Sequence, residues 1–233
     1  MDTPNYTLRY SKKAKYLQLR LSREGLELVI PTKRFFPSTM IEAFIQKKRA
    51  WIIKNWHKHQ EVCHESTVSL PGHIHLNAIN QVWEVKYVET IGKKLKLVSN
   101  LSRQIILMGN IKDVPSCSQL LKKWLKNIAQ PVLAEELLKV SMETGLLFED
   151  VSVRNNLTRW GSCSSRQHIS LCCNLLFLSY PLMRHVLLHE LCHTKVMNHG
   201  PKFWGLFEKF DPEAKSNAKR LRIAAKELPM WTK

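Results

Sequence analysis

Acidic residues and long apolar runs are both scarce in this sequence. Its 233 residues include 19 Asp and Glu against 36 Lys and Arg, which gives a formal net charge of +17. No run approaches the ~18 apolar residues that a membrane-spanning helix needs, and the N-terminal segment lacks the apolar core of a signal peptide. We therefore expect a cytoplasmic protein with no membrane partner, whose positive charge favours anionic partners such as nucleic acid.

Cysteine pairing motifs and repeats are missing as well. None of the six cysteines forms a C-x-x-C pair, and Cys172 is directly followed by Cys173, which suits neither a disulfide framework nor a zinc ribbon. We expect reduced thiols, as is usual in the cytosol. The chain has no internal repeat or low-complexity tract, and its 44% apolar and 24% charged residues are ordinary for a globular protein.

The first half of the chain has the patterns of a small, mainly β region. Apolar residues alternate over 17–30, which predicts a β-hairpin. Helical spacing over Ile41–Trp56 predicts a helix at 38–59 with a basic face. Short β-type runs follow at 82–88, 95–98 and 105–108. Residues 1–110 are therefore expected to form an N-terminal, mainly β region with one amphipathic helix.

The second half alternates between helical and extended patterns. A long helical pattern begins near Ser116 and ends near Gly145, and Pro131 is expected to kink or restart it. The other elements expected are strands at 151–153 and 169–176, a helix from Pro181 to about His199–Pro201, and helices near 203–210 and 212–228.

A short motif, His189-Glu190-Leu191-Cys192-His193, lies in the apolar helix that begins at Pro181. Residues four apart share one helical face, so His189 and His193 can bind one Zn²⁺ together. Glu190 can then act as general base on a water that the metal activates. A buried cluster of this kind would be costly without a metal, so a helix with incidental histidines is the less favoured interpretation.

A catalytic zinc site needs a third protein ligand, and His199 is the candidate. Five residues separate it from His193, as in H-E-x-x-H-x-x-G-x-x-H enzymes, although Val196 stands where that pattern has glycine. Asn198 or Gly200 is expected to supply a left-handed residue in its place.

Three nearby residues leave alternatives open. His199 could instead cap the C-terminal end of a helix. Glu208 is the rival third ligand, because some zinc peptidases use a downstream glutamate. His185 precedes His189 by one helical turn, and we interpret it as a packed or partly exposed histidine rather than as a group that supports a ligand.

Five segments around this helix form a longer pattern: Thr158–Ser165, Ile169–Leu171, His189–His193, Asn198–His199 and Phe203–Trp204. The pattern resembles the YgjP-like metallopeptidase family, which is related to the SprT-like and WLM metalloproteases. The resemblance implies an α+β fold, in which a zincin-like metallopeptidase domain at 111–233 packs a small sheet on the active-site helix and follows a basic β-hairpin and helix. It also implies Zn²⁺ as cofactor, with three histidine ligands: His189, His193 and His199.

The resemblance also implies where a substrate would lie. In such zincins an edge strand above the active-site helix pairs with extended peptide backbone, and Ile169–Leu171 is the candidate strand. Arg159, Trp160 or Ser162 is expected near the cleft, where one of them could stabilise an oxyanion. The structural interpretation of Trp160-Gly161 is a tight turn with a packed indole.

Two classes of function follow. The first is a zinc-dependent peptidase acting on peptides or proteins, including proteins associated with DNA. The second is a nucleic-acid-binding protein with a structural or vestigial zinc site. Residues 1–60 carry 13 Lys and Arg against 4 Asp and Glu. Trp51 and Trp56 there could stack on bases, although such tryptophans more often belong to a helix core. Glu190 favours the peptidase, because a structural site needs a fourth ligand and no general base.

Overall fold

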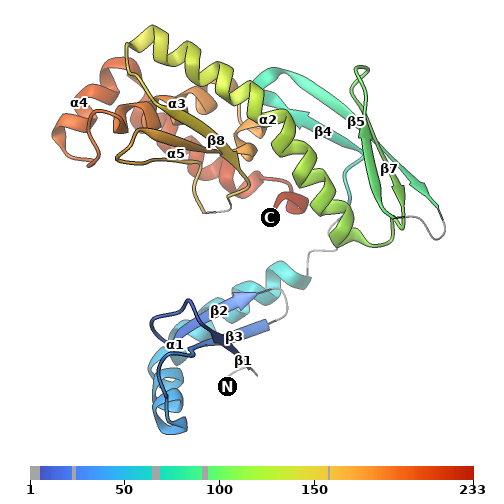
Figure 1. The fold of residues 1–233 in the computed structure, drawn as a ribbon, viewed down its shortest axis with the longest axis vertical. Helices are drawn as coiled ribbons and strands as arrows, with labels where there is room; N and C mark the ends of the chain where they lie inside the picture. The colour runs from blue at the N-terminus through green and yellow to red at the C-terminus, as the bar shows by residue number, and fades with distance from the viewer. Residues whose placement is uncertain (1–5, 23–24, 65–68, 91–93, 157) are drawn as a thin grey trace. The chain divides into compact units, whose positions relative to one another are not determined.

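The computed structural model describes residues 6–22, 25–64, 69–90, 94–156 and 158–233, and the chain has a mixed α+β fold (Figure 1). It consists of two compact units, Met1–Thr67 and Val68–Lys233. Each unit has its own cluster of buried apolar side chains. Within the described ranges, no helix is long and apolar enough to cross a membrane.

The first unit is a three-stranded sheet with one helix. β2 (Gln18–Ser22) and β3 (Gly25–Pro31) form the predicted antiparallel hairpin, and β1 (Tyr6–Ser11) pairs with β3 in parallel. No strand is predicted for β1, although Tyr6, Leu8 and Tyr10 alternate with polar residues, and all three of these side chains are exposed. α1 (Ser38–His64) begins where predicted and ends beyond residue 59. The buried core of this first unit consists of Leu26, Leu28, Ile30, Ile45 and Ile52.

The second unit begins with a four-stranded sheet in the order β4-β5-β7-β6. Trp83 in this sheet packs edge-on against Trp124 of the following helix, with ring centroids 5.1 Å apart. The sheet therefore shares its core with that helix, which differs from the division expected after residue 110. The elements are β4 (His73–Leu76), the 3₁₀ helix η1 (Asn77–Ile79), β5 (Gln81–Glu89), β6 (Lys96–Ser99) and β7 (Gln104–Gly109).

The helix α2 (Val114–Thr144) connects this sheet to the rest of the unit. Asp113 caps its start, because Oδ1 accepts a hydrogen bond from the backbone N–H of Ser116 at 3.1 Å. The helix runs through Pro131 without interruption, so the predicted restart is wrong. Ala129 and Leu133 on either side of the proline are fully buried, and this tertiary packing stabilises a helix that local sequence disfavours.

A second, three-stranded sheet follows α2 in the order β8-β10-β9. β10 (His168–Cys172) is the central strand, parallel to β8 (Asp150–Arg154) and antiparallel to β9 (Gly161–Cys163). The strand predicted at 169–176 therefore ends at Cys172, and the chain continues as the 3₁₀ helix η2 (Cys173–Phe177).

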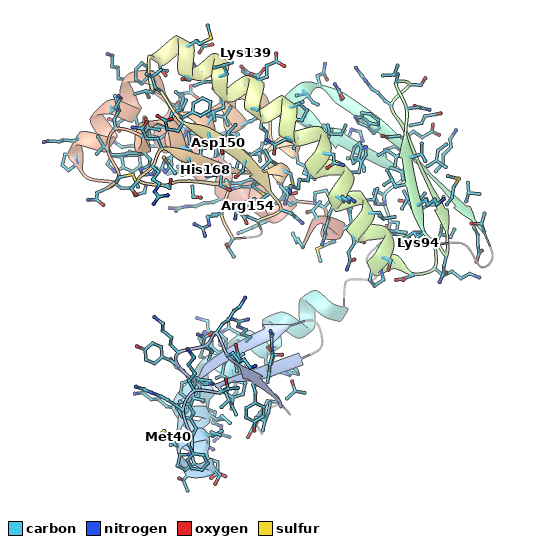
Figure 2. All side chains as sticks on the ribbon, in the orientation of Figure 1. Met40, Lys94, Lys139, Asp150, Arg154 and His168 are labelled. Atoms are coloured by element: carbon cyan, nitrogen blue, oxygen red, sulfur yellow. The ribbon has the colours of Figure 1, made fainter. Side chains whose placement is uncertain are left out.

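The two faces of this sheet differ in polarity. Ile169 and Leu171 of β10 are fully buried in the apolar core. The alternate residues are polar: Asp150 Oδ2 lies 3.1 Å from His168 Nδ1, and His168 Nε2 lies 3.0 Å from Ser152 Oγ (Figure 2). Along β10 only His168 is partly exposed, because Ser170 and Cys172 on the polar side are buried as well.

The buried helix α3 (Tyr180–His193) packs against β9, α2 and two further helices, α4 (Pro201–Phe210) and α5 (Ala214–Glu227). A 3₁₀ helix, η3 (Met230–Thr232), follows. The expected small sheet on the motif helix is thereby confirmed. α3 ends at His193, earlier than predicted, where the Thr194 hydroxyl donates to the carbonyl of Leu191 at 2.8 Å. A threonine that bonds its own helix backbone in this way weakens helix continuation.

Candidate metal centre and catalytic cleft

The three histidines of the motif converge on one point. His189 and His193 lie one turn apart on α3, and their Nε2 atoms are 3.2 Å apart. Nε2 of His199, from the loop before α4, lies 3.0 Å from Nε2 of His189. The ligand atoms of all three residues lie within 4.8 Å of one another.

The loop between α3 and α4 brings His199 back to the helix. Nδ1 of His193 lies 3.1 Å from the carbonyl oxygen of Val196 and can donate a hydrogen bond to it, which leaves Nε2 with its lone pair. Neither Asn198 nor Gly200 has a positive φ angle, so the expected left-handed residue is absent from this described loop. The reversal uses ordinary backbone conformations, and Gly200 is extended, with φ −82° and ψ −176°.

An aromatic ring supports the cluster from α4. Phe203 is fully buried and stacks on His193, with ring centroids 4.6 Å apart. Its ring also contacts His189 at 5.0 Å and His199 at 4.7 Å. One side chain therefore restricts the orientation of all three imidazoles.

The donor set fits a tetrahedral metal ion. Two ligands at the ~2.0–2.1 Å Zn–N distance of a tetrahedral site lie about 3.3 Å apart, close to the Nε2 separations found here. Burial, followed by the neighbouring histidines, lowers the pKa of His189 to about 3, so this imidazole is neutral and its lone pair is available near pH 7. Metal binding requires neutral imidazole.

Within the described part of the chain, this histidine group is the one cluster of three or more potential metal ligands. The rival ligand Glu208 is outside it, and its carboxylate pairs with Nζ of Lys215 at 3.2 Å. Among the residues that the structure describes, the site therefore offers three imidazole ligands and no fourth protein ligand.

Glu190 is a buried carboxylate next to the first histidine. Its side chain and backbone are 5% exposed, and no hydrogen bond reaches the carboxylate from the residues that the structure describes. Burial raises the pKa of Glu190 to about 7, and the nearby charge of Arg159 opposes this rise. A carboxyl group with a pKa near the working pH can both accept and return a proton.

The edge strand β9 presses directly on this carboxylate. A Cβ atom on Gly161 would lie 2.6 Å from Oε1 and 2.8 Å from Cδ of Glu190. The absence of a side chain is therefore what lets the strand approach the helix. The Trp-Gly pair predicts a tight turn in the sequence, whereas Gly161 starts β9 and Trp160 forms a bend just before it.

His185 lies one turn before His189 and is also buried, with 5% exposure. Its Nδ1 is hydrogen-bonded to Oδ2 of Asp211, at the end of α4. Asp211 also accepts hydrogen bonds from Nδ2 of Asn217 and from the backbone N–H of Glu213. The packed histidine that the sequence predicts is confirmed, but nothing in the sequence indicated its partner, 26 residues away.

A cavity of about 410 Å³ opens beside the histidines and the carboxylate. Arg159 and Trp160 from the segment before β9 line it together with His189 and Glu190. Two of the residues expected near the cleft are therefore there. Ser162 is half-buried on β9, opposite Ser170 of β10.

A family model described as YgjP-like, metallopeptidase domain matches residues 15–224 of this chain. The chain belongs to the YgjP-like family. The match spans both compact units, so the small N-terminal sheet and α1 are largely part of the YgjP-like region. Metallopeptidases hydrolyse peptide bonds with a metal ion, and the three converging histidines are the group that could hold one.

One solved structure is similar to part of the chain. This structure, "Crystal structure of the metallopeptidase zymogen of Pyrococcus abyssi abylysin", matches at 26% identity, covering 40% of this chain and 93% of that one, with a TM-score of 0.37. A comparison with curated proteins finds no match.

One expectation about the YgjP-like cleft is wrong. Ile169 and Leu171 do not lie on an edge strand, because β10 is paired on both sides, with β8 and with β9. Both side chains are fully buried in the core. The edge strand of this sheet that contacts α3 is β9 (Gly161–Cys163).

The basic face expected of the N-terminal helix in this YgjP-like chain stays a prediction. Trp51 is 44% exposed on α1, whereas Trp56 packs partly against the core of its unit. Trp51 borders a surface cavity of about 490 Å³, lined also by Leu17, Gln18, Leu19, Arg20, Phe44 and Lys48. The five cysteines that the structure describes are free thiols, as expected.

Proposed function

We propose that this chain is a zinc-dependent peptidase in which His189, His193 and His199 hold the metal and Glu190 is the general base. The observation that carries the proposal is the convergence of three imidazole nitrogens beside a buried carboxylate on the same helix. Zinc in such a site acts as a Lewis acid, which polarises a carbonyl oxygen and lowers the pKa of water.

Glu190 moves the proton. Its carboxylate accepts a proton from the attacking water and returns it to the nitrogen of the leaving amine. The burial that raises its pKa to about 7 supports this role, because a carboxyl group with a pKa near neutral pH can accept a proton and then return it. His193 donates Nδ1–H to Val196, which supports a ligand role for its Nε2.

The edge strand β9 is the proposed site of substrate backbone. An extended peptide added beside Gly161–Cys163 would pass over Glu190, because Gly161 touches that carboxylate. Arg159 borders the same cavity, and its cation is placed to stabilise the oxyanion that forms on the scissile carbonyl. Ser162 and Trp160 flank this path, while Ile169 and Leu171 support it from the core.

The test combines zinc content with cleavage of a denatured protein. Glu190→Gln is expected to bind one equivalent of zinc and to lose at least about 100-fold in kcat. His199→Ala is expected to lose zinc, whereas Glu208→Gln retains it and serves as the matched control. Equal cleavage by Glu190→Gln and wild type would refute the catalytic assignment, and unchanged zinc in His199→Ala would refute the third ligand.

A second candidate function, binding of single-stranded nucleic acid by the N-terminal unit, is favoured by one observation. An exposed tryptophan, Trp51, lines a surface cavity together with the cations Arg20 and Lys48. Bases stack on aromatic rings and phosphates pair with such cations. The zinc site would then be structural or vestigial, or the peptidase would act on DNA-associated proteins. For either function we propose a cytoplasmic location.

Nucleic-acid binding is tested by the salt dependence of affinity for a single-stranded oligonucleotide. Replacing Arg20 and Lys48 with Gln is expected to reduce the slope of log K against log salt by about 1.4. Trp51→Ala is expected to weaken binding by about 1–3 kcal/mol. Affinity that none of these changes alters would reject the candidate.

A further inference from the structure

The cavity of about 410 Å³ beside Glu190 has mostly apolar walls. α3 contributes Val186, α4 contributes Trp204 and Phe207, and α5 contributes Ala218 and Leu221. The cavity is large enough to hold one large side chain of a substrate, and its apolar walls suit an apolar or aromatic one. Because it also borders His189 and Glu190, anything held in it would lie next to the reacting bond of the proposed peptidase.

One polar group interrupts the apolar lining. His185 lines the cavity and is only 5% exposed. Asp211 holds its Nδ1, and Asn217 and the backbone of Glu213 hold Asp211 in turn. With Nδ1–H donating to the carboxylate, Nε2 carries the lone pair and is the acceptor. No hydrogen bond to Nε2 is found among the residues that the structure describes.

Two cationic side chains line the cavity. Arg159 and Arg222 line it and are both exposed. Glu190 is the one carboxylate in the lining, and its proposed role is proton transfer rather than binding of a cationic side chain. Two guanidinium groups disfavour entry of lysine or arginine side chains by like-charge repulsion.

We infer that this cavity is a side-chain subsite that takes a tyrosine of the substrate, with His185 accepting its phenolic hydroxyl. The inference rests on the proposed peptidase function and names part of its substrate class. The ring would pack against the apolar walls, and the hydroxyl would donate to the His185 ring nitrogen, which a bound phenylalanine would cover without a partner. A pocket that offers a buried hydrogen-bonding group discriminates against the analogue that lacks the partner, so tyrosine is preferred over phenylalanine.

The experiment is cleavage-site profiling of a denatured protein mixture by mass spectrometry with the zinc-loaded full chain. At one position flanking the cleaved bond, wild type is expected to favour tyrosine over phenylalanine by about tenfold, and to disfavour lysine and arginine. The double variant His185→Leu, Asp211→Asn removes the acceptor without leaving a buried carboxylate unpaired. It is expected to favour phenylalanine at least as much as tyrosine, with zinc content unchanged.

A second variant tests the cavity without disturbing His185. Ala218→Phe fills the pocket from α5 and is expected to shift the preference from aromatic to small residues. Lys219→Phe, the next residue on α5 but outside the cavity lining, is the matched control and is expected to keep the wild-type profile.

The outcomes separate the two levels of the argument. Cleavage without any tyrosine preference, or with a profile that neither variant alters, overturns the subsite and leaves the peptidase proposal standing. A zinc-loaded wild type that cleaves nothing overturns the proposed function, and the subsite with it. A tyrosine preference lost in the double variant and in Ala218→Phe supports both.

Discussion

Gly161 and Glu190 are in contact across the interface between β9 and α3. A Cβ atom on Gly161 would lie 2.6 Å from Oε1 of Glu190, closer than real Cβ atoms come to other atoms. The edge strand and the carboxylate thus determine each other's position. Because the carboxylate is the proposed base and the strand the proposed substrate platform, this contact aligns the two.

Gly161→Ala should therefore displace Glu190. We expect kcat to fall by at least about 100-fold, because a misplaced base loses most of its contribution, while zinc content stays at the wild-type value. Gly205→Ala on α4 is the control, since its added Cβ would meet open space. Wild-type kcat in Gly161→Ala, measured on any cleaved peptide, would contradict the contact's importance.

The stability of the metal-free protein should depend on pH through Glu190. Burial raises its pKa from 4.5 to about 7, so the folded state holds a proton more tightly than the unfolded state. Stability from this group is complete below pH 4.5 and is lost as pH rises through 7. Metal-free Glu190→Gln, which does not ionise, should therefore gain on the order of 3 kcal/mol over wild type between pH 4.5 and pH 8.

Urea unfolding of both metal-free proteins across this pH range measures that gain. Because all other titrating groups are shared, the difference between the two curves isolates Glu190. A difference that stays constant from pH 4 to pH 8 would show that the buried carboxyl has an ordinary pKa.

Removing metal should lower the thermal stability of wild type. Zinc that binds the folded state only, at 1,000 times its Kd, would stabilise it by about 4 kcal/mol. We expect the increase in Tm on adding zinc to the chelated protein to disappear in His193→Ala and to persist in Glu208→Gln. An undiminished increase in His193→Ala would place the metal elsewhere.

Truncating Phe203 should affect both the fold and the metal site. Phe203→Ala removes a fully buried ring, which costs about 3–5 kcal/mol of unfolding free energy. It should also weaken zinc binding, because the ring stacks on His193. Leu101→Ala, at a fully exposed position in the same unit, is expected to change stability by less than about 0.5 kcal/mol. Equal stabilities of the two variants would contradict the packing described.

Local sequence patterns predicted the elements in which apolar residues recur at a regular spacing. The hairpin of β2 and β3, the helix α1 and the strands β5 and β7 are in place because each has a regular apolar face, and the short strand β6 is in place as well. Patterns failed where burial does not alternate or where tertiary packing overrides propensity. The short strand β1 carries its apolar residues Tyr6, Leu8 and Tyr10 in exposed positions, and α2 continues through Pro131 because the residues around it are buried.

The sequence by itself determined that His189 and His193 share a helical face with Glu190 beside them, because four-residue spacing fixes neighbours on any helix. Only the tertiary structure decided that β10 is central and β9 the edge, that Gly161 touches Glu190, and that Asp211 holds His185. These relationships join residues far apart in the chain. They depend on how strands and helices pack in three dimensions, and no local periodicity records that packing.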